Sequence, residues 1–367
     1  MKIYTLTKKE FLPKYSLESQ HDKKGSVSWQ SPSNIALIKY WGKTSPQIPK
    51  NASVSFTLSN CYTTTRLLYK QKDPSTKGFD FKVFFEGKEK ENFRPKIESF
   101  FDRIESYVPF IRSFEFEIHT ENSFPHSSGI ASSASGLSAL ALCLMSLEKE
   151  IDPDMSSDHF FQKASFLARL GSGSAARSIK GPLVVWGKHP EIKGSNDAYG
   201  TEYPFEIDPV YISFQDCILL VDQGIKQVSS TVGHNLMIDH PFAEARFNQA
   251  KDNMTRLVPV LQEGNLDAFI NIVEKEALSL HAMMMTSDPY FILMKPNTLK
   301  IIERIWDFRK RSGTHICFTL DAGANVHVLY PQKDTEAVDA FIQEELVGFC
   351  EDNKYIRDQV GTGAMLL

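Results

Sequence analysis

Alternating apolar and polar residues predict β-strands in the first third of the chain. Residues 114–119 and residues 79–85 both place an aromatic or aliphatic side chain at every second position. This two-residue period puts one face of a strand on the core and the other toward solvent. Two uninterrupted apolar runs, residues 181–187 and 217–221, predict shorter strands that are buried on both faces.

Helical periodicity is found between and after these strands. The segments with this spacing are residues 135–148, 158–170, 242–262, 266–283 and 298–311. Pro296, Asn297 and Thr298 form a start signal for the last of these helices. Because strands and helices alternate along the chain and no internal repeat occurs, the pattern predicts a two-layer protein of the α/β or α+β class.

Changes in composition suggest where the chain divides. Residues 1–28 are polar and contain Pro13 and Gly25, so we expect an extension that packs on the surface. Residues 188–209 are rich in Pro, Gly, Asn and Asp, which is typical of a connection between lobes. We therefore predict an extension over 1–28, an N-terminal lobe over 29–205 and a C-terminal lobe over 206–367.

Overall composition excludes several classes of protein. The 367 residues are 42% hydrophobic and 23% charged, with a formal net charge of -4, so no basic excess favours general nucleic-acid binding. No segment has the apolar length of a signal peptide or a membrane span. The five cysteines are far apart and form no CxxC pair, so we expect neither disulfides nor a zinc site, and a cytoplasmic location.

Small residues are concentrated in the segment from Pro125 to Gly136, which follows a predicted strand and leads into a predicted helix. Backbone N–H groups at such a helix start bind phosphate, and the hydroxyls of Ser132 and Ser133 can add to that binding. The alternative is a small-residue loop that only lets the helix pack closely. The position between strand and helix favours phosphate binding. It is not a Walker loop, because Leu37 stands where the Gly42-Lys43-Thr44 sequence would need a glycine.

A second small-residue segment runs from Gly171 to Ser178 and formally fits the dinucleotide pattern GxGxxA. A predicted helix precedes it, whereas a dinucleotide site needs a strand there, so we discount that function. Two serine hydroxyls and Arg177 suit a loop that binds carboxylate or phosphate. A helix-breaking loop with a solvated Arg177 explains the residues equally well.

Two further segments carry candidate chemistry. Lys39, Tyr40 and Lys43 lie close together and could face an anion, or the same segment is a strand that Trp41 anchors in the core. Asp321 lies in an Asp-Ala-Gly sequence between two β-like runs, which primarily indicates a turn. An acid at the end of a strand is nevertheless placed to meet a substrate proton. The ten histidines show no metal-ligand spacing.

Taken together, six segments are similar to the motifs of diphosphomevalonate decarboxylases, which belong to the GHMP kinase superfamily. They occur in the order of that family and lie between about residues 30 and 330. The segments are residues 34–43, 51–55, 129–136, 171–178, 228–231 and 321–325.

The resemblance implies an α+β fold of the GHMP kinase type, with an N-terminal lobe like the second domain of ribosomal protein S5 and a ferredoxin-like C-terminal lobe. The activity it implies is ATP-dependent conversion of (R)-5-diphosphomevalonate, also called mevalonate 5-diphosphate, to isopentenyl diphosphate, ADP, phosphate and CO2. ATP is then the co-substrate and Mg2+ its metal ion. The resemblance also implies a homodimer.

By matching position, the resemblance assigns Asp321 and Arg177 as catalytic residues. The residues it implies for substrate binding are Tyr40, Trp41, Gly42, Lys43, Arg94, Ser172, Gly173, Ser174, Ala175, Ala176, Arg177, Ser230 and Thr231. The residues it implies for ATP binding are Ser128, Gly129, Ala131, Ser132 and Ser133. Asp321 acts either as a base or as a group that orients the hydroxyl and stabilises positive charge. No protein ligand for the metal is evident.

This chain departs from the family at three motif positions. Ala324 stands where the family often has Pro, Ala176 where it often has Cys, and His234 where it often has Met. Rival functions are a GHMP kinase, a decarboxylase for another mevalonate phosphate, and a non-catalytic ligand sensor. Retention of Asp321 and Arg177 favours a decarboxylase over a kinase, and the complete motif set disfavours a sensor.

Overall fold

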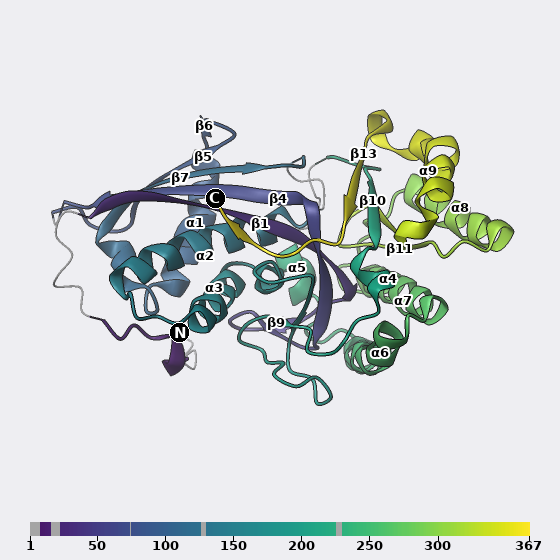
Figure 1. Ribbon diagram of the computed structural model, residues 1–367, viewed down its shortest axis with the longest axis horizontal. Coiled ribbons are helices and arrows are strands. Elements are labelled where there is room, and N and C mark those ends of the chain that lie inside the picture. Colours follow the sequence, from purple (N-terminus) through teal and green to yellow (C-terminus); the bar gives the residue numbers. More distant parts are fainter. Residues whose placement is uncertain (1–7, 16–22, 74, 126–129, 225–229) are drawn as a thin grey trace.

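The computed structural model describes residues 8–15, 23–73, 75–125, 130–224 and 230–367, with the backbone alone for Ser230 and Thr231. Figure 1 shows one elongated molecule, with helices beneath long strands at one end and a second sheet with its own helices at the other. No helix in these ranges is both long and apolar enough to cross a membrane.

The larger sheet is organised around two long antiparallel strands, β1 (Lys24–Ile38) and β4 (Ser53–Gln71). Its order is β14-β1-β4-β7-β5-β6, with β8 also on β4 and β9 on β8. Among the described strand pairs of this sheet, only β5–β7 is parallel. The other strands are β5 (Asp80–Phe85), β6 (Lys88–Glu89), β7 (Phe114–Asn122), β8 (Leu183–Trp186), β9 (Thr201–Glu202) and β14 (Met365–Leu366).

The smaller sheet is antiparallel and has the order β11-β12-β10-β13. Its strands are β10 (Gln215–Leu219), β11 (Cys317–Thr319), β12 (Val326–Tyr330) and β13 (Tyr355–Gln359). The first strand of this sheet in chain order, β10, therefore lies between the third and the fourth, β12 and β13. This is the ferredoxin-like arrangement that the family resemblance implies. A separate two-stranded hairpin joins β2 (Lys43–Thr44) to β3 (Ile48–Pro49).

The predicted helices are all present, with ends within a few residues of those expected. The α-helices are α1 (Arg94–Ile104), α2 (Ser132–Ile151), α3 (Ser157–Gly171), α4 (Pro209–Ile212), α5 (Ser230–Asn235), α6 (Ala243–Glu263), α7 (Leu266–Met285), α8 (Pro296–Ser312) and α9 (Thr335–Phe341). The described 3₁₀ and π turns are Lys9–Phe11, Glu91–Phe93, Pro109–Arg112, Gly173–Arg177, Gln332–Asp334, Ile342–Leu346, Val347–Phe349 and Glu351–Asn353. The residues expected to form strands at 79–85, 114–119, 181–187 and 217–221 correspond to β5, β7, β8 and β10.

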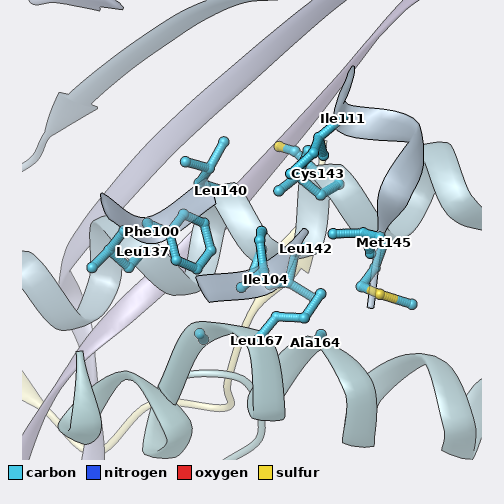
Figure 2. Close-up of a cluster of buried hydrophobic side chains, with 14 of the residues drawn as sticks. Phe100, Ile104, Ile111, Leu137, Leu140, Leu142, Cys143, Met145, Ala164 and Leu167 are labelled. Carbon is cyan, nitrogen blue, oxygen red and sulfur yellow. The ribbon is translucent and has the colours of Figure 1, made fainter. Parts of the chain in front are cut away.

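One apolar core lies between the larger sheet and helices α1, α2 and α3. Figure 2 shows Phe100 and Ile104 of α1 facing α2, and Leu167 of α3 below them. These side chains are at most 1% exposed, and burial of apolar groups of this kind is the main driving force for folding.

The long strands β1 and β4 also reach a second core. Trp29 packs in the first core, whereas Ile35 and Leu37, further along β1, pack in a core that includes α6 and α7. Residues 31–39 are consequently buried without the alternation that a half-exposed strand would show. The C-terminal end of β1 is therefore fixed between the two ends of the molecule.

Both ends of the described chain return to the first core and sheet. Phe11 is 1% exposed and stacks on Phe166 with ring centroids 4.6 Å apart, so this part of the N-terminal segment enters the core and does not only cover the surface. At the other end, Leu366 pairs with Trp29 of β1. The lobe boundary at residues 205 and 206 stays a prediction.

Candidate active site

An ion pair joins the end of β1 to the loop after β11. Nζ of Lys39 lies 3.0 Å from Oδ1 of Asp321, with the Lys39 side chain 2% exposed and that of Asp321 29% exposed. Burial lowers the pKa of Lys39, and the neighbouring Asp321 opposes that shift. The carboxylate is thus paired with a buried cation and partly exposed.

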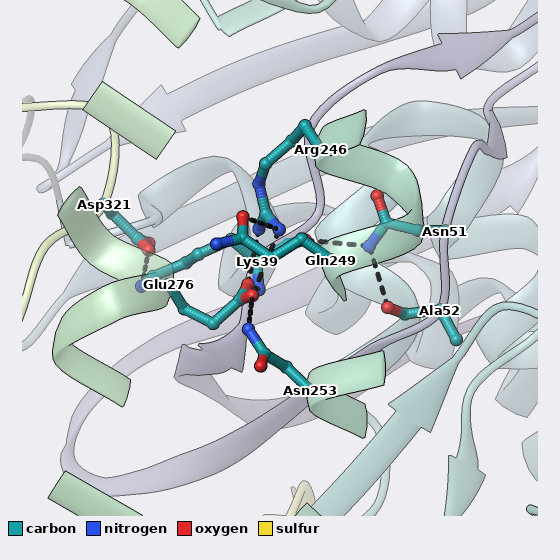
Figure 3. Close-up of polar contacts among 8 residues, drawn as sticks. All are labelled: Lys39, Asn51, Ala52, Arg246, Gln249, Asn253, Glu276 and Asp321. Carbon is teal, nitrogen blue, oxygen red and sulfur yellow. Dashed lines mark hydrogen bonds and ion pairs between the residues drawn. The ribbon is translucent and has the colours of Figure 1, made fainter. Parts of the chain in front are cut away.

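The backbone of Lys39 is held on both sides by buried polar groups (Figure 3). Its N–H donates to Oε2 of Glu276 at 2.8 Å, and its carbonyl accepts from Nδ2 of Asn51 at 2.9 Å. Glu276 itself pairs with Arg246 and accepts from Asn253 at 2.7 Å. These buried contacts fix the backbone from which the Lys39 side chain reaches Asp321.

Helix α7 also holds the backbone carbonyl of Asp321. Nε2 of His281 lies 3.1 Å from the Asp321 carbonyl oxygen and donates to it. Burial lowers the pKa of His281 to about 4, so the ring is neutral near pH 7. Asp321 is therefore positioned through both its side chain and its backbone.

Arg177 ends the 3₁₀ turn Gly173–Arg177 and is 2% exposed. Its Nε donates to Oγ of Ser55 at 2.6 Å, and one terminal nitrogen donates to Oγ of Ser53 at 2.5 Å. Burial lowers its pKa to about 10, which Asp321 opposes, so the guanidinium stays charged. Its contacts are neutral hydroxyls, so this buried cation is suited to a carboxylate or phosphate ligand.

Tyr40 presents a buried hydroxyl for which the described residues supply no hydrogen-bond partner. Its ring packs against Trp186 and His234, with centroids 4.7 and 4.2 Å apart. A Cβ on Gly173 would lie 2.8 Å from the Tyr40 hydroxyl oxygen, so the glycine permits this close approach. Buried hydroxyls are normally paired, and this one is therefore a candidate ligand contact.

Helix α5 brings His234 beside the predicted substrate segment. Nδ1 of His234 accepts from the N–H of Gly42 at 2.9 Å, which leaves the proton of the neutral ring on Nε2. Burial, then the charges of Lys43 and Arg177, lower its pKa to about 3. His234 is thus a neutral hydrogen-bond donor near two cations.

A cavity of about 1180 Å³ opens beside Gly42 and Lys43. Its cationic lining residues are Lys43, Lys50, Lys96 and Arg103. Gly42 has φ of +96°, and a Cβ there would meet the Phe247 ring at 2.8 Å, so this turn requires glycine. Both the size and the charge suit a small anionic molecule.

The predicted nucleotide loop lies beside the predicted substrate loop. Helix α2 begins at Ser132 after Ala131, whose φ of 44° and ψ of 36° are left-handed. Oγ of Ser133 lies 3.4 Å from Oγ of Ser172. The start of α2 therefore places its first N–H groups next to the loop that carries Arg177. Ser128 and Gly129 lie outside the described residues.

The structure brings most predicted site residues together, with Arg94 as the exception. Trp41 packs on His234 at a centroid distance of 4.6 Å. The residues Ser172, Gly173, Ser174, Ala175 and Ala176 precede Arg177 on its turn or just before it. Ser230 and Thr231 begin α5, and their side chains lie outside the described part. Arg94 instead donates to Glu98 and to the Phe81 carbonyl and does not line the cavity.

Several residues at the site were not assigned from the sequence. Ser53 and Ser55 lie in a recognised segment, but nothing in the sequence indicated that they hold Arg177. Glu276 and His281 lie on α7, where helical periodicity gives no sign of their contacts with the end of β1 and with Asp321. The pairing of Lys39 with Asp321 depends on two distant segments meeting, which spacing alone does not predict.

Two family models match the chain in succession. Residues 31–199 match the diphosphomevalonate decarboxylase-like N-terminal domain, and residues 217–362 match the mevalonate 5-diphosphate decarboxylase C-terminal domain. The diphosphomevalonate decarboxylase of Debaryomyces hansenii is 30% identical over 331 residues, which cover 84% of this chain and 80% of that protein. The chain belongs to the diphosphomevalonate decarboxylase family. The enzyme of Bos taurus is 28% identical over 341 residues, which cover 85% of this chain and 78% of that protein.

Solved structures of diphosphomevalonate decarboxylases share the whole architecture. The structure from Staphylococcus aureus has a TM-score of 0.80 at 25% identity and covers 94% of this chain and 98% of its own. A structure described as MDDEF in complex with MVAPP, AMPPCP and magnesium has a TM-score of 0.79 at 25% identity and covers 94% of this chain and 99% of its own. The expected GHMP kinase fold is confirmed by these likenesses.

Proposed function

We propose that this chain catalyses the ATP-dependent decarboxylation of (R)-mevalonate 5-diphosphate to isopentenyl diphosphate, ADP, phosphate and CO2. The observation that carries the proposal is the Lys39–Asp321 ion pair beside the buried, charged Arg177. Family membership and the relatives' names support the same reaction. A related structure described with MVAPP, AMPPCP and magnesium supports the same pair of substrates.

The proposed chemistry needs one acid and one cation near the reacting carbon atoms. Asp321 faces the tertiary 3-hydroxyl, orients it and takes its proton as the γ-phosphoryl group of ATP is transferred. Arg177 binds the substrate carboxylate and fixes its plane. The C–C bond to the carboxylate then breaks, its electrons form the alkene, and the 3-phosphate leaves with the C–O bond electrons.

The described residues position these groups. Lys39 stabilises negative charge on Asp321 at a distance of 3.0 Å, while Ser53 and Ser55 fix Arg177. In the alternative role, Asp321 keeps its charge and only orients the hydroxyl, and its carboxylate then stabilises the positive charge that develops at C3. Most of the rate enhancement is then expected from positioning and from preorganised charge.

The proposed ATP site is the start of α2. Its first N–H groups and the hydroxyls of Ser132 and Ser133 are suited to nucleotide phosphates, and Ser133 lies 3.4 Å from Ser172 of the substrate loop. Among the described residues no group of three or more Cys, His, Asp or Glu could hold a metal ion. Mg2+ is therefore expected to be held mainly by phosphate oxygens and water, and it would neutralise charge on the transferred phosphoryl group.

The deciding experiment measures CO2, ADP and isopentenyl diphosphate together, from purified protein with Mg-ATP and mevalonate 5-diphosphate. We expect all three in equal amounts. ADP without CO2 would identify a kinase, and substrate binding without turnover would identify a sensor. Homodimer formation and a cytoplasmic location are further proposals that rest on the family alone. Light scattering after size-exclusion chromatography tests the first of these.

A further inference from the structure

Arg169 is a buried cation in the last turn of α3, and among the described residues it forms no ion pair. It is 2% exposed. Its Nε donates to the Ala198 carbonyl at 2.7 Å, and one terminal nitrogen donates to the carbonyls of Pro46 and Gln47 at 2.7 and 2.9 Å. A cation buried without an anion is tolerated only when its N–H groups are paired. Here the guanidinium is paired by joining two other segments of backbone.

The first of these segments is the hairpin of β2 and β3, which has residues 45–47 at its tip. The arms of the hairpin meet where the Lys50 N–H donates to the Gly42 carbonyl at 3.2 Å. Gln47 has φ of 57°, in the left-handed region that a residue other than glycine rarely adopts. Such a conformation persists only where its surroundings hold it. The bond from Arg169 to the Gln47 carbonyl is one of the contacts that do so.

The same hairpin forms one wall of the cavity at the candidate active site. Its tip and the preceding residue, Thr44, line the cavity, and Lys43 begins β2. A hairpin of two short strands is at best marginally stable by itself. Its position, and with it the position of the Lys43 ammonium group, therefore depends on contacts with the rest of the molecule.

The second segment is the loop that contains Ala198, and it supports the ring of Tyr40. Nε1 of Trp186 donates to the carbonyl of Asp197, the neighbour of Ala198, at 3.0 Å. The Trp186 ring in turn packs against Tyr40 with centroids 4.7 Å apart. Arg169 thus joins the hairpin that follows Tyr40 to the loop behind it.

The end of α3 also connects directly to two other parts of the site. The Leu170 carbonyl accepts from Arg103 of α1 at 2.8 Å. The 3₁₀ turn that ends at Arg177 begins two residues after the end of α3. Cations at the C-terminal end of a helix also interact favourably with its dipole. The hairpin, α1 and the Arg177 turn therefore all meet at the last turn of α3.

We propose that Arg169 is a positioning residue for the reaction, which anchors the β2–β3 hairpin to α3 and so places Lys43 in the substrate cavity. This inference rests on the proposed function and adds a residue that does not itself line the cavity. The guanidinium carries several donors in a fixed planar arrangement, so it can bond two segments at once. A lysine keeps the charge but has a single nitrogen, so it retains only part of this anchor.

The first test measures KM and kcat for mevalonate 5-diphosphate in Arg169→Met and Arg169→Lys. We expect Arg169→Met to raise KM about 10- to 100-fold, because Lys43 loses its fixed position. The value of kcat should change by less than about threefold, since Arg177 and Asp321 are held by other contacts. Arg169→Lys should restore part of the loss and raise KM about 3- to 10-fold.

Lys163→Met is the matched control for loss of a buried cation from the same helix. Lys163 is 1% exposed, pairs with Glu148 and donates to the Tyr107 carbonyl at 2.9 Å, and it does not line the cavity. We expect this variant to unfold at a lower temperature and to keep KM within about threefold of the wild type.

Two kinetic outcomes would overturn the inference. One is a KM within about threefold of the wild type in folded Arg169→Met, and the other is an equal rise of KM in Lys163→Met. Thermal unfolding shows which variants are folded. If Arg169→Met does not fold, Arg169→Lys carries the test, because it keeps the charge and changes only the number of carbonyls that are bound.

Hydrogen–deuterium exchange of residues 42–50 separates the anchor from the proposed function, because it needs no turnover. We expect these amides to exchange about 10-fold or more faster in Arg169→Met than in the wild type, and at the wild-type rate in Lys163→Met. If the wild type fails to decarboxylate but this difference is found, the proposed function fails and the anchor stands. If the wild type decarboxylates and exchange in Arg169→Met is unchanged, the anchor is overturned.

Discussion

Lys39 and Asp321 are 282 residues apart in the chain, yet Nζ of one lies 3.0 Å from Oδ1 of the other. Each comes from a different sheet, Lys39 from the end of β1 and Asp321 from the loop after β11. The pair exists only when both parts of the molecule are correctly docked. Catalytic competence is therefore linked to the packing of α7 against β1, where Glu276 holds the Lys39 N–H.

Replacing the carboxylate tests the role of Asp321. We expect Asp321→Asn to lower kcat by about 100- to 10,000-fold, the range typical of a lost acid–base group. Nucleotide affinity, measured by fluorescence titration, should stay within about threefold. Lys39→Met retains the Asp321 carboxylate and removes its ion-pair partner. We expect it to lower kcat less than Asp321→Asn does. Normal turnover by Asp321→Asn would refute the proposed role.

We expect a substitution of Arg177 to impair use of the phosphorylated acid and to leave ATP binding unchanged. We expect Arg177→Gln to lower kcat/KM for the phosphorylated acid by at least about 100-fold, because a charged contact to carboxylate is lost. Ser55→Ala removes one acceptor from the same guanidinium and should cause a smaller loss, about tenfold. Steady-state kinetics, with the phosphorylated acid and ATP varied in turn, separates an effect on the acid from an effect on ATP. A selective loss of ATP binding would contradict the assignment.

A substitution of Tyr40 separates an effect on substrate binding from an effect on the stability of the fold. Its hydroxyl has no partner among the described residues, so Tyr40→Phe should leave the free energy of unfolding unchanged or raise it by up to about 1 kcal/mol. KM for the phosphorylated acid should rise about tenfold. Tyr203→Phe is a matched control, since that hydroxyl is also buried and unpartnered but lies in the core beside α6 and α7. Similar kinetics in both variants would exclude a ligand contact by Tyr40.

The buried neutral histidines predict a pH-dependent stability. The pKa values of His234 and His281 fall from 6.5 to about 3 and about 4 on folding. The unfolded chain binds more protons below pH 6.5, so stability falls as pH decreases through the window from about 6.5 to 4. Each histidine ring should lower the free energy of unfolding by about 2 kcal/mol at pH 5 relative to pH 7.

Urea unfolding at the two pH values measures this effect. His234→Met should reduce the loss of stability between pH 7 and pH 5 by about 2 kcal/mol, since one of the two groups is removed. An unchanged pH dependence in that variant would show that His234 does not contribute.

The N-terminal segment should stabilise the first core. Phe11 stacks on Phe166 and is 1% exposed, so Phe11→Ala is expected to lower the free energy of unfolding by about 3 to 5 kcal/mol. Lys9→Ala on the same turn is exposed and should change it by less than about 0.5 kcal/mol. Urea denaturation compares the two. A loss below about 1 kcal/mol in Phe11→Ala would mean that the segment only covers the surface.

The sequence predicted features that depend on neighbouring residues better than features that depend on residues far apart in the chain. The helices and the strands at 79–85 and 114–119 follow from local periodicity, and their ends were close to those observed. Arg94 illustrates the limit, because a motif match gave its position but not its partners, Glu98 and the Phe81 carbonyl. Glu276 and Phe11 were missed for a related reason, since their partners are more than a hundred residues away.

The pairing of Leu366 with Trp29 has a consequence for biosynthesis. Until β14 has been synthesised, the edge of β1 that faces away from β4 has no neighbouring strand. Unpaired edges favour association with other chains. Strand β14 covers that edge only at Trp29 and Gln30, and its residues 365 and 366 are made long after β1. An incompletely synthesised chain therefore exposes these two positions of β1 to pairing with other strands until β14 docks.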